Sequence, residues 1–409
     1  MFKTGFERFV ARRFLAKEGS SFSRSLVRIA MGSIALGVVV MVMSVCILRG
    51  FQKEIESKVI GFGSHIIVKS YEVGQQFEEI PISTDRPEVE RIQGLPEVSH
   101  IQFFATKGGM IKTQDQIHGI IFKGVDSGYD SSFFAQNIVE GRLFGFTDSA
   151  ASNEVIISQT IAKKLNLAIG DKVRTYFWQG ENYRARAFTV TGIYSTDLAD
   201  FDEHYIVGDL RQVQRINGWD SSQVAGYEVL IKDFNNLDNV SNEVLQQLSY
   251  DLTLTTIVAQ NPALFSWLDL LNSNIILILS IMALVCAVSI ISALLIMIFE
   301  KTSMIGTLKS MGANNASIRK IFLLKSSEII LKGILIGDLI AFILCELQQR
   351  LQIIKLDPES YSMSFVPIEL SGWLFLGVSV GTFVVCLIAL LIPIRQTTHI
   401  KPAITIKSE

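Results

Sequence analysis

The sequence predicts an α-helical membrane protein with four transmembrane helices and a large α+β extracytoplasmic domain inserted between helices 1 and 2. Three observations predict this fold class. Only 19% of the 409 residues are charged and the mean hydropathy is +0.37, whereas soluble domains carry about 25% charged residues. Four long apolar runs have the length of a bilayer core. Between the first two runs the sequence changes to a pattern of short strands and turns.

The first apolar run, residues 29–48, contains no charged residue. It is longer than the apolar core of about 7–15 residues in a secretory signal, and no small-x-small cleavage site follows it. The polar stretch from Arg49 to Glu54 continues as a helical sequence. We therefore expect a retained span rather than a cleaved leader.

Two further runs, residues 275–299 and 373–394, are also uncharged and predict helices 2 and 4. Lys and Arg are concentrated before the first run, between the second and third, and after the fourth. This distribution places those segments, and so both termini, in the cytoplasm, with the large domain outside. The expected division is 1–28 cytoplasmic amphipathic segment, 29–50 helix 1, 51–270 periplasmic domain, 273–299 helix 2, 300–320 cytoplasmic coupling loop, 321–347 helix 3, 348–370 short periplasmic loop, 371–394 helix 4 and 395–409 cytoplasmic tail.

The third run, residues 329–347, is interrupted by charge. Lys325, Glu328 and Lys332 share one helix face at i, i+3 and i+7, where opposite charges can pair. Asp338 lies deeper. An ionised Asp at the centre of a span costs roughly 2.5–3.5 kcal/mol on insertion scales, so its side chain must face protein or water. We take Asp338 as a candidate intramembrane polar site, with either a structural or a transport role.

Residues 51–270 alternate β-branched and aromatic residues with Gly, Asp and Asn. This composition is typical of short strands separated by turns. The expected strands are 65–71, 109–113, 117–122, 154–157, 171–177, 187–194 and 226–231, and the expected helices are 158–167, 209–216 and 236–248. The mixture predicts an α+β domain in two lobes.

Motifs for catalysis or metal binding are missing from the sequence. There is no Gly-Lys dipeptide, and hence no P-loop, and there is no HExxH. The four cysteines lie in or beside apolar runs and form no CxxC pair. The acidic stretch 197–204 matches no calcium loop and is interpreted as a solvated turn. We expect no metal, no cofactor and no enzymatic activity in this chain, and the net charge of −2 argues against a nucleic-acid partner.

Two segments carry a resemblance to a known family. The first is residues 9–68, including Phe-Val-Ala-Arg-Arg-Phe before the first run and Arg-Gly-Phe-Gln-Lys-Glu after it. The second is residues 300–322, beginning Glu-Lys-Thr-Ser-Met-Ile-Gly-Thr-Leu-Lys-Ser-Met-Gly-Ala. Both resemble the FtsX-like permeases of MacB/Lol-type ABC transporters, and most closely the lipoprotein-releasing subunits.

The resemblance implies a mechanism and partners. A second permease protomer, either identical or a paralogue, and two copies of a separate ATPase subunit that binds ATP and Mg would complete the transporter. The lipoprotein-releasing branch extracts lipoproteins from the bacterial inner membrane, among its lipids, and delivers them to a periplasmic carrier. MacB-like efflux of drugs, peptides or toxins is the alternative, and FtsX-like signalling to cell-wall hydrolases is a second one.

A short amphipathic helix is predicted within residues 301–313, because apolar side chains recur at helical spacing and a glycine can end it. By resemblance this segment couples the permease to the ATPase. A helix lying on the lipid surface is the other interpretation. The candidate coupling residues are Met304, Ile305, Gly306, Leu308, Lys309, Met311 and Gly312.

By resemblance, the lipoprotein site lies between helix 1 of one protomer and helix 2 of the other. The candidate lipid or lipoprotein contacts are Met41, Met43, Val45, Leu48, Phe265, Leu268 and Leu271. Ordinary helix packing accounts for the same residues. Residues 176–184 occupy the position of a carrier-capturing hairpin, with Trp178 and Tyr183 as candidate contacts, although an ordinary turn fits the same stretch.

Overall fold

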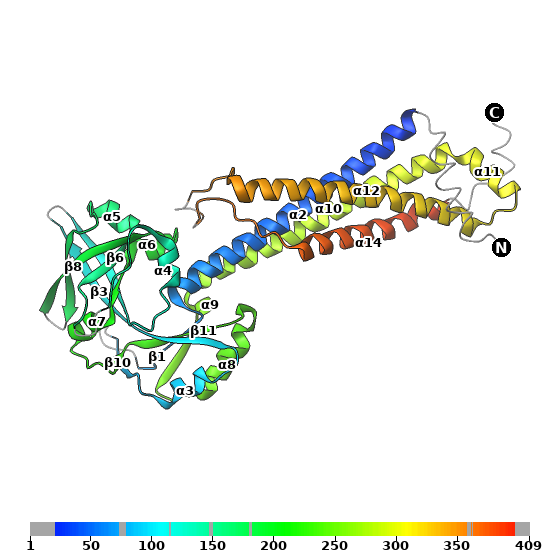
Figure 1. Ribbon diagram of the computed structural model, residues 1–409. Coiled ribbons are helices and arrows are strands. Elements are labelled where there is room, and N and C mark those ends of the chain that lie inside the picture. The colour runs from blue at the N-terminus through cyan, green and yellow to red at the C-terminus, as the bar shows by residue number, and fades with distance from the viewer. Residues whose placement is uncertain are drawn as a thin grey trace. The chain divides into compact units, whose positions relative to one another are not determined.

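Long helices make up one part of the chain and strands the other (Figure 1). The computed structural model describes residues 21–72, 79–113, 116–146, 150–179, 182–357, 361 and 363–396. The chain divides into two units. One consists of Met1–Gln52, Trp267–Ile354 and Val366–Glu409, and the other of Lys53–Ser266 and Lys355–Phe365. We call them the helical unit and the sheet unit. Most of the predicted cytoplasmic tail and most of the predicted N-terminal segment lie outside the described residues.

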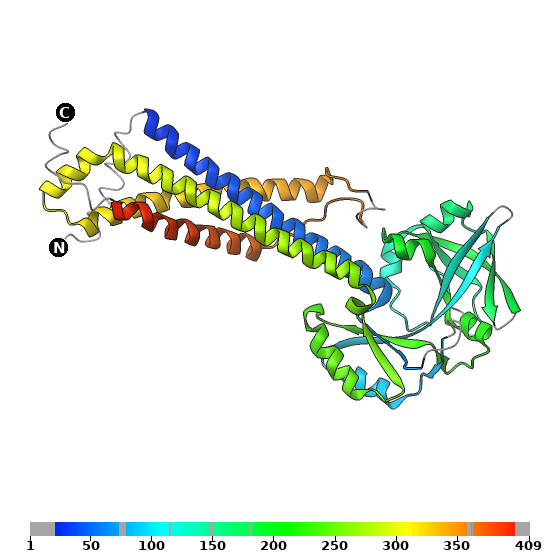
Figure 2. The same cartoon turned by 180° about the vertical axis from the view of Figure 1, so that it is seen from behind.

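The apolar runs fold into long helices that lie side by side in both views (Figures 1 and 2). The helices are α2 (Ser21–Gly63), α10 (Pro262–Glu300), α12 (Asn315–Leu351) and α14 (Gly372–Gln396). Their buried core includes Ile34 from α2, Cys286 from α10, Ile330 from α12 and Leu390 from α14. Both α2 and α10 also contribute residues to the sheet unit.

Glycines bring α12 close to α2. A Cβ on Gly337 would lie 2.7 Å from the carbonyl oxygen of Ala35 and 2.8 Å from Cβ of Val38. A Cβ on Gly333 would lie 3.0 Å from Ile34. Small residues allow helix backbones to approach closely in a membrane, where dispersion contacts replace the hydrophobic effect between helices.

Three helices are long and apolar enough to cross a membrane, judged by length and composition: Val27–Gly63, Pro262–Glu300 and Gly372–Ile394. The helix α12 is not among them, because Lys332, Asp338 and Glu346 interrupt its apolar sequence. The prediction of four spans is therefore confirmed for three helices within the described residues. The crossing by α12 stays a prediction.

In the sheet unit, one set of strands closes into a barrel. The order β3-β4-β9-β6-β8 returns to β3 through β7, which pairs with both ends. The bounds are β3 Val98–Lys112, β4 Ile117–Val125, β6 Glu154–Ser158, β7 Lys172–Gln179, β8 Asn182–Tyr194 and β9 Tyr205–Asp209. The rings of Phe122, Phe177 and Phe188 meet in its core, with centroids 5.0–6.2 Å apart.

The other part of the sheet unit is an open antiparallel sheet. Its order is β12-β1-β11-β3, so β3 belongs to both parts. The bounds are β1 Ile66–Ser70, β11 Gly226–Ile231 and β12 Leu252–Thr256. The helices α3 (Pro87–Gln93) and α8 (Leu237–Gln247) lie against this sheet (Figure 1). The prediction of a large α+β domain in two lobes is confirmed.

The remaining elements of the sheet unit are short. They are β2 Ile82–Ser83, α4 Ser132–Asn137, β5 Ile138–Gly141, α5 Gln159–Leu165, α6 Ala199–His204, α7 Leu210–Asn217, β10 Gln223–Val224, η2 Phe234–Asn236 and α9 Ile257–Gln260. The helices α5 and α7 begin as their sequences predict. The Ser158 hydroxyl accepts the N–H of Ile161, and the Asp209 carboxylate accepts that of Arg211.

Candidate functional site

The candidate lipid contacts fall into different environments. Met41, Leu48 and Leu268 are buried in the packing of the chain itself. Met43, Val45 and Leu271 are half-buried. The ring of Phe265 stacks on that of Phe234 in the sheet unit, with centroids 6.0 Å apart. At least four of the seven residues therefore take part in packing within one protomer, and the role of all seven as ligand contacts stays a prediction.

A continuous exposed apolar face lies instead on α10. Its residues recur at intervals of three, four and seven, so they occupy one side of the helix. They are Leu270, Leu277, Ile281, Leu284 and Val288. Such a face suits lipid tails or a second apolar helix.

Four of the charged side chains of α12 that interrupt or border its apolar sequence, Lys325, Glu328, Lys332 and Asp338, have polar partners. The Oε1 of Glu328 lies 2.6 Å from Nζ of Lys332, and its Oε2 lies 3.1 Å from Nζ of Lys325. This confirms the predicted pairing on one helix face. The Ser379 hydroxyl on α14 donates to both carboxylate oxygens of Asp338, at 2.7 and 3.0 Å. The Asp338 carboxylate therefore joins α12 to α14, and its role, structural or in transport, stays a prediction.

The predicted amphipathic helix is present as α11 (Thr302–Ser310) (Figure 1). Gly312 follows it with a φ of +91°, a conformation that favours glycine. Ile305 is fully buried in the core of the helical unit, Gly306 is also buried, and Met304 packs against the same core. The apolar stripe is therefore largely covered by the chain's own helices. Met311, 73% exposed, is the large apolar side chain that this segment leaves open.

The stretch with the two candidate carrier contacts is a β-hairpin. The strands β7 and β8 pair antiparallel, with Trp178 opposite Tyr183. The two rings meet edge to face with centroids 4.8 Å apart, and the side chains are 44% and 53% exposed. The two rings leave an exposed aromatic surface near the end of the hairpin, and their role as carrier contacts stays a prediction.

The acidic stretch is more ordered than a solvated turn. Asp202 is only 3% exposed and accepts hydrogen bonds from the Thr196 hydroxyl at 2.8 Å and the Asp197 N–H at 3.2 Å. Burial raises the pKa of Asp202. Asp197 pairs with Lys58 at 3.2 Å and accepts a hydrogen bond from the Ser364 hydroxyl. The prediction of a solvated turn is therefore wrong for Asp202, because its carboxylate orders the loop before α6. Within the described ranges, no three His, Cys, Asp or Glu residues are placed to hold a metal ion.

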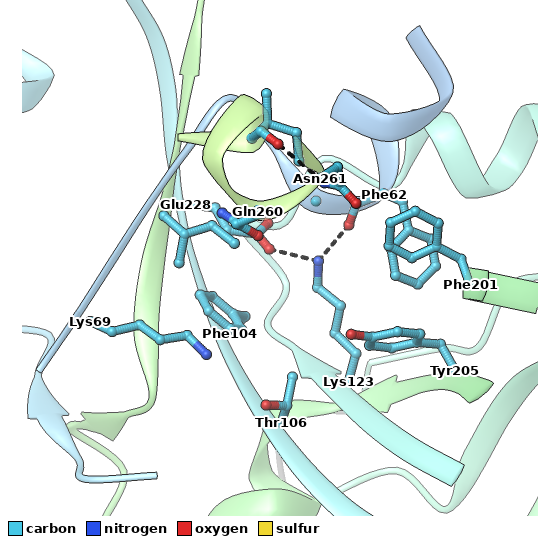
Figure 3. Close-up of a pocket in the computed structure, with 13 residues that line it drawn as sticks. Phe62, Lys69, Phe104, Thr106, Lys123, Phe201, Tyr205, Glu228, Gln260 and Asn261 are labelled. Atoms are coloured by element: carbon cyan, nitrogen blue, oxygen red, sulfur yellow. Dashed lines mark hydrogen bonds and ion pairs between the residues drawn. The ribbon is translucent and has the colours of Figure 1, made fainter. Parts of the chain in front are cut away.

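A cavity of about 250 Å³ lies within the sheet unit, beside the last turn of α2, which belongs to that unit (Figure 3). The aromatic rings of Phe62, Phe104, Phe201 and Tyr205 line it, together with the charged side chains of Lys69, Lys123 and Glu228. Lys123 and Glu228 form an ion pair of 2.6 Å, and both side chains are almost completely buried.

Sequence reasoning missed this ion pair. A signal was available, because Lys123 and Glu228 are each the single charged residue of an otherwise apolar strand. A charge on a buried strand requires a partner. The partner itself could not be found from the sequence, since the two residues are distant along the chain.

These features together define a protein with three helices long and apolar enough to cross a membrane and a large α+β domain. The sequence model of the MacB-like periplasmic core domain matches residues 29–247, and that of the FtsX-like permease C-terminal domain matches residues 276–402. The chain belongs to this family of MacB-like and FtsX-like permeases.

Curated relatives match almost the whole chain at low identity. The lipoprotein-releasing system transmembrane protein LolE of Haemophilus influenzae is 23% identical over 390 residues, which cover 92% of each chain. The protein LolC of Xylella fastidiosa is 22% identical over 421 residues, which cover 98% of each. Among solved structures, the periplasmic region of MacB from Actinobacillus actinomycetemcomitans matches 52% of this chain and 98% of its own, with 13% identity and a TM-score of 0.34.

Proposed function

We propose that the chain is a permease subunit of an ABC transporter that releases lipoproteins from the bacterial inner membrane and delivers them to a periplasmic carrier. The observation that carries this proposal is the span of the similarity. The LolE and LolC relatives align with 92% and 98% of the chain, so the outer domain and the permease half occur together and in the same order. Similarity in one domain alone would not favour lipoprotein release over other kinds of transport.

The helical unit supports a fourth crossing by α12. Apolar side chains such as Leu335, Leu339 and Ile343 are exposed along it, as a lipid-facing surface requires. Its buried glycines pack against α2, and its carboxylate at position 338 is hydrogen-bonded to α14. Polar groups that are satisfied inside a bundle are tolerated in a membrane. With four crossings, both termini and α11 lie on the cytoplasmic side.

On that side, we assign ATPase binding to the segment containing α11. The exposed side chain of Met311 would contact the ATPase, and the buried side chain of Ile305 holds the segment against the transmembrane helices. A helix fixed to the transmembrane helices in this way can pass on a movement of the ATPase. ATP and Mg would be bound by the partner subunit, because this sequence has no P-loop.

The exposed apolar face of α10 is the surface that we assign to acyl chains and to the second permease protomer. Residues such as Leu277, Ile281 and Leu284 form a wall that opens sideways rather than an enclosed pocket. A substrate that stays in the bilayer until release requires such an opening. Water-soluble substrates of efflux pumps require an aqueous path instead.

The hairpin of β7 and β8 would bind the carrier. The aromatic pair at Trp178 and Tyr183 provides the apolar anchors that are common at protein interfaces. The exposed basic side chains of Lys172 and Arg174 on β7 would favour an acidic partner surface.

Depletion of the chain in its own cells, followed by separation of inner and outer membranes, tests the proposal. We expect outer-membrane lipoproteins to accumulate in the inner membrane. Unchanged lipoprotein sorting together with new sensitivity to drugs or toxins would contradict it and select efflux. Unchanged sorting with a defect in cell-wall hydrolysis would select signalling.

A further inference from the structure

The ammonium group of Lys123 has three partners, one on α2, one on β11 and one in the loop after β4. It donates to the carbonyl oxygen of Phe62 at 2.7 Å and to Oε1 of Glu228 at 2.6 Å (Figure 3). It also donates to the hydroxyl of Tyr129 at 3.1 Å. Phe62 lies in the last turn of α2, Lys123 on the barrel strand β4, and Glu228 on β11 of the open sheet. One buried charge therefore joins α2, the barrel and the open sheet.

The carbonyl of Phe62 is a group that needs such a partner. The last four carbonyls of a helix have no partner within the helix, and the helix dipole makes this end negative. A buried cation can donate a hydrogen bond to such a carbonyl, and its positive charge is stabilised at the negative end of the helix. The Phe62 side chain is held separately, because its ring packs against Phe201 and Tyr205 with centroids 4.5 and 4.9 Å away. The end of α2 is thus fixed through both its backbone and its side chain.

Both carboxylate oxygens of Glu228 have hydrogen-bond partners, and Oε1 is bonded to Lys123. Its Oε2 accepts a hydrogen bond of 2.7 Å from the Gln102 amide, and the residue is 1% exposed. The rings of Phe62, Phe104 and Tyr129 surround the ammonium group at 5.2–5.7 Å. Folding alone does not require this arrangement, because apolar residues of similar volume often stabilise a protein as well as a buried ion pair does. What apolar residues cannot supply is a directional bond to the helix carbonyl.

We propose that Lys123, held by Glu228, is a positioning residue that transmits movements of α2 to both parts of the sheet unit during transport. This inference rests on the proposed function. Because α2 is one helix from Ser21 to Gly63, a displacement in its membrane part reaches Phe62 without an intervening loop. The adjoining cavity of about 250 Å³ gives the surrounding rings space to move.

The experiment uses the double variant Lys123→Met/Glu228→Gln in the full chain, reconstituted with its ATPase partner, a lipoprotein and the carrier. Lys123→Met alone would leave a buried carboxylate unpaired and risk unfolding. The double variant removes both charges, keeps the volume, and leaves an acceptor for Gln102. We expect normal assembly and ATP hydrolysis, while the lipoprotein released per ATP falls about tenfold, as loss of a typical coupling energy implies.

The matched control is Lys164→Met/Glu203→Gln, which removes an exposed ion pair of 2.9 Å in the same unit. It should release as much lipoprotein per ATP as the wild type. If the Lys123→Met/Glu228→Gln variant released as much lipoprotein per ATP as the wild type, the proposal would be overturned. Failure of that variant to assemble would assign the pair to folding and would overturn it as well.

Hydrogen exchange tests this inference independently of the proposed function, because amide exchange in the complex can be measured without a lipoprotein substrate. In the wild-type complex, trapping the ATPase in its ATP-bound state should change amide protection in the last turn of α2 and in β4 and β11 together. In the double variant the change should stop at α2. A wild type that releases no lipoprotein would refute the function, whereas an unaltered exchange pattern in the double variant would refute the coupling role.

Discussion

The hydroxyl of Ser379 on α14 lies 2.7 Å from Oδ2 of Asp338 on α12 and donates a hydrogen bond to it. This bond satisfies a carboxylate within the helical unit and ties α12 to α14. In a low-dielectric environment an unsatisfied carboxylate is expensive, so the pair contributes to the packing of these helices.

The first prediction concerns that bond. Ser379→Ala should destabilise the helical unit by about 1–3 kcal/mol, because Asp338 loses its hydrogen-bond donor. Thermal unfolding of the purified chain in detergent measures the effect. Ser292→Ala is the matched control, since that hydroxyl bonds only to the carbonyl of Val288 in its own helix. Equal stability of the two variants would show that the Asp338 bond contributes nothing.

The close approach of α12 to α2 gives the second prediction. Gly337→Leu should destabilise the helical unit by roughly 1–3 kcal/mol or more, because its Cβ would meet Ala35 and Val38 below 3 Å. Gly381→Leu on α14 should be tolerated, as a Cβ there meets nothing within 4 Å. Yield and thermal stability in detergent check both variants. A stable Gly337→Leu chain would contradict the packing described.

The third prediction separates binding of the ATPase from folding. Met311→Asp should abolish co-purification of the ATPase while leaving membrane insertion and thermal stability unchanged, because the side chain is 73% exposed. Ile305→Asp should instead unfold the helical unit, since Ile305 is fully buried.

The control for this experiment is Tyr250→Asp, which places the same charge on a 97% exposed apolar residue of the sheet unit. It should leave ATPase binding intact. Normal binding by the Met311→Asp variant would assign the coupling surface to another segment.

The fourth prediction tests the hairpin. Trp178→Ala/Tyr183→Ala should weaken binding of the carrier at least about tenfold, the loss expected when two aromatic anchors are removed from an interface. ATP hydrolysis by the transporter should be unaffected. Titration of purified carrier onto the immobilised complex measures the affinity. Tyr250→Ala, another exposed aromatic residue of the same unit, should change nothing.

The fifth prediction concerns pH. His65 precedes β1, is buried, and accepts the backbone N–H of Ile231 through Nδ1 at 3.3 Å, so its ring is neutral in the folded chain. Burial lowers the pKa of His65 to about 4 from 6.5. Below pH 6.5 the unfolded chain binds a proton that the folded chain does not, so stability falls as the pH falls from about 6.5 to about 4.

The expected loss from His65 over this range is roughly 2–3 kcal/mol. Chemical denaturation of the sheet unit within the full chain, at several pH values, measures it. His65→Asn keeps an acceptor for the Ile231 N–H but does not titrate, so its stability should depend less on pH. The same pH dependence in both proteins would show that His65 is not the group responsible.

Much of this fold could be predicted from local sequence. The strand β11 spans the predicted residues, and β1 and β6 lie within one or two residues of their expected ranges, because each is a short β-branched run bounded by turn residues. The helices α5 and α7 fall within or next to the predicted ranges 158–167 and 209–216, and their first residues are capped by Ser158 and Asp209. Local signals of this kind are strong when one element is both regular and amphipathic.

The remainder depends on contacts between distant segments. The larger part of β3 was missed, since the stretch from Val98 to Gly108 is a strand mainly because β11 and β4 pair with it. The strand β9 is short and follows directly on α6, so only its pairing with β4 and β6 identifies it. The burial of Ile305 was missed for the same reason, because a helical stripe does not reveal which neighbour covers it.

Release of a lipoprotein from a defined membrane tests the central claim most directly. Proteoliposomes would contain the full chain, its permease partner, the ATPase and a triacylated lipoprotein, with purified carrier outside. The account predicts that lipoprotein moves to the carrier only when ATP is added. Retention of the lipoprotein in the vesicles despite active ATP hydrolysis would contradict it.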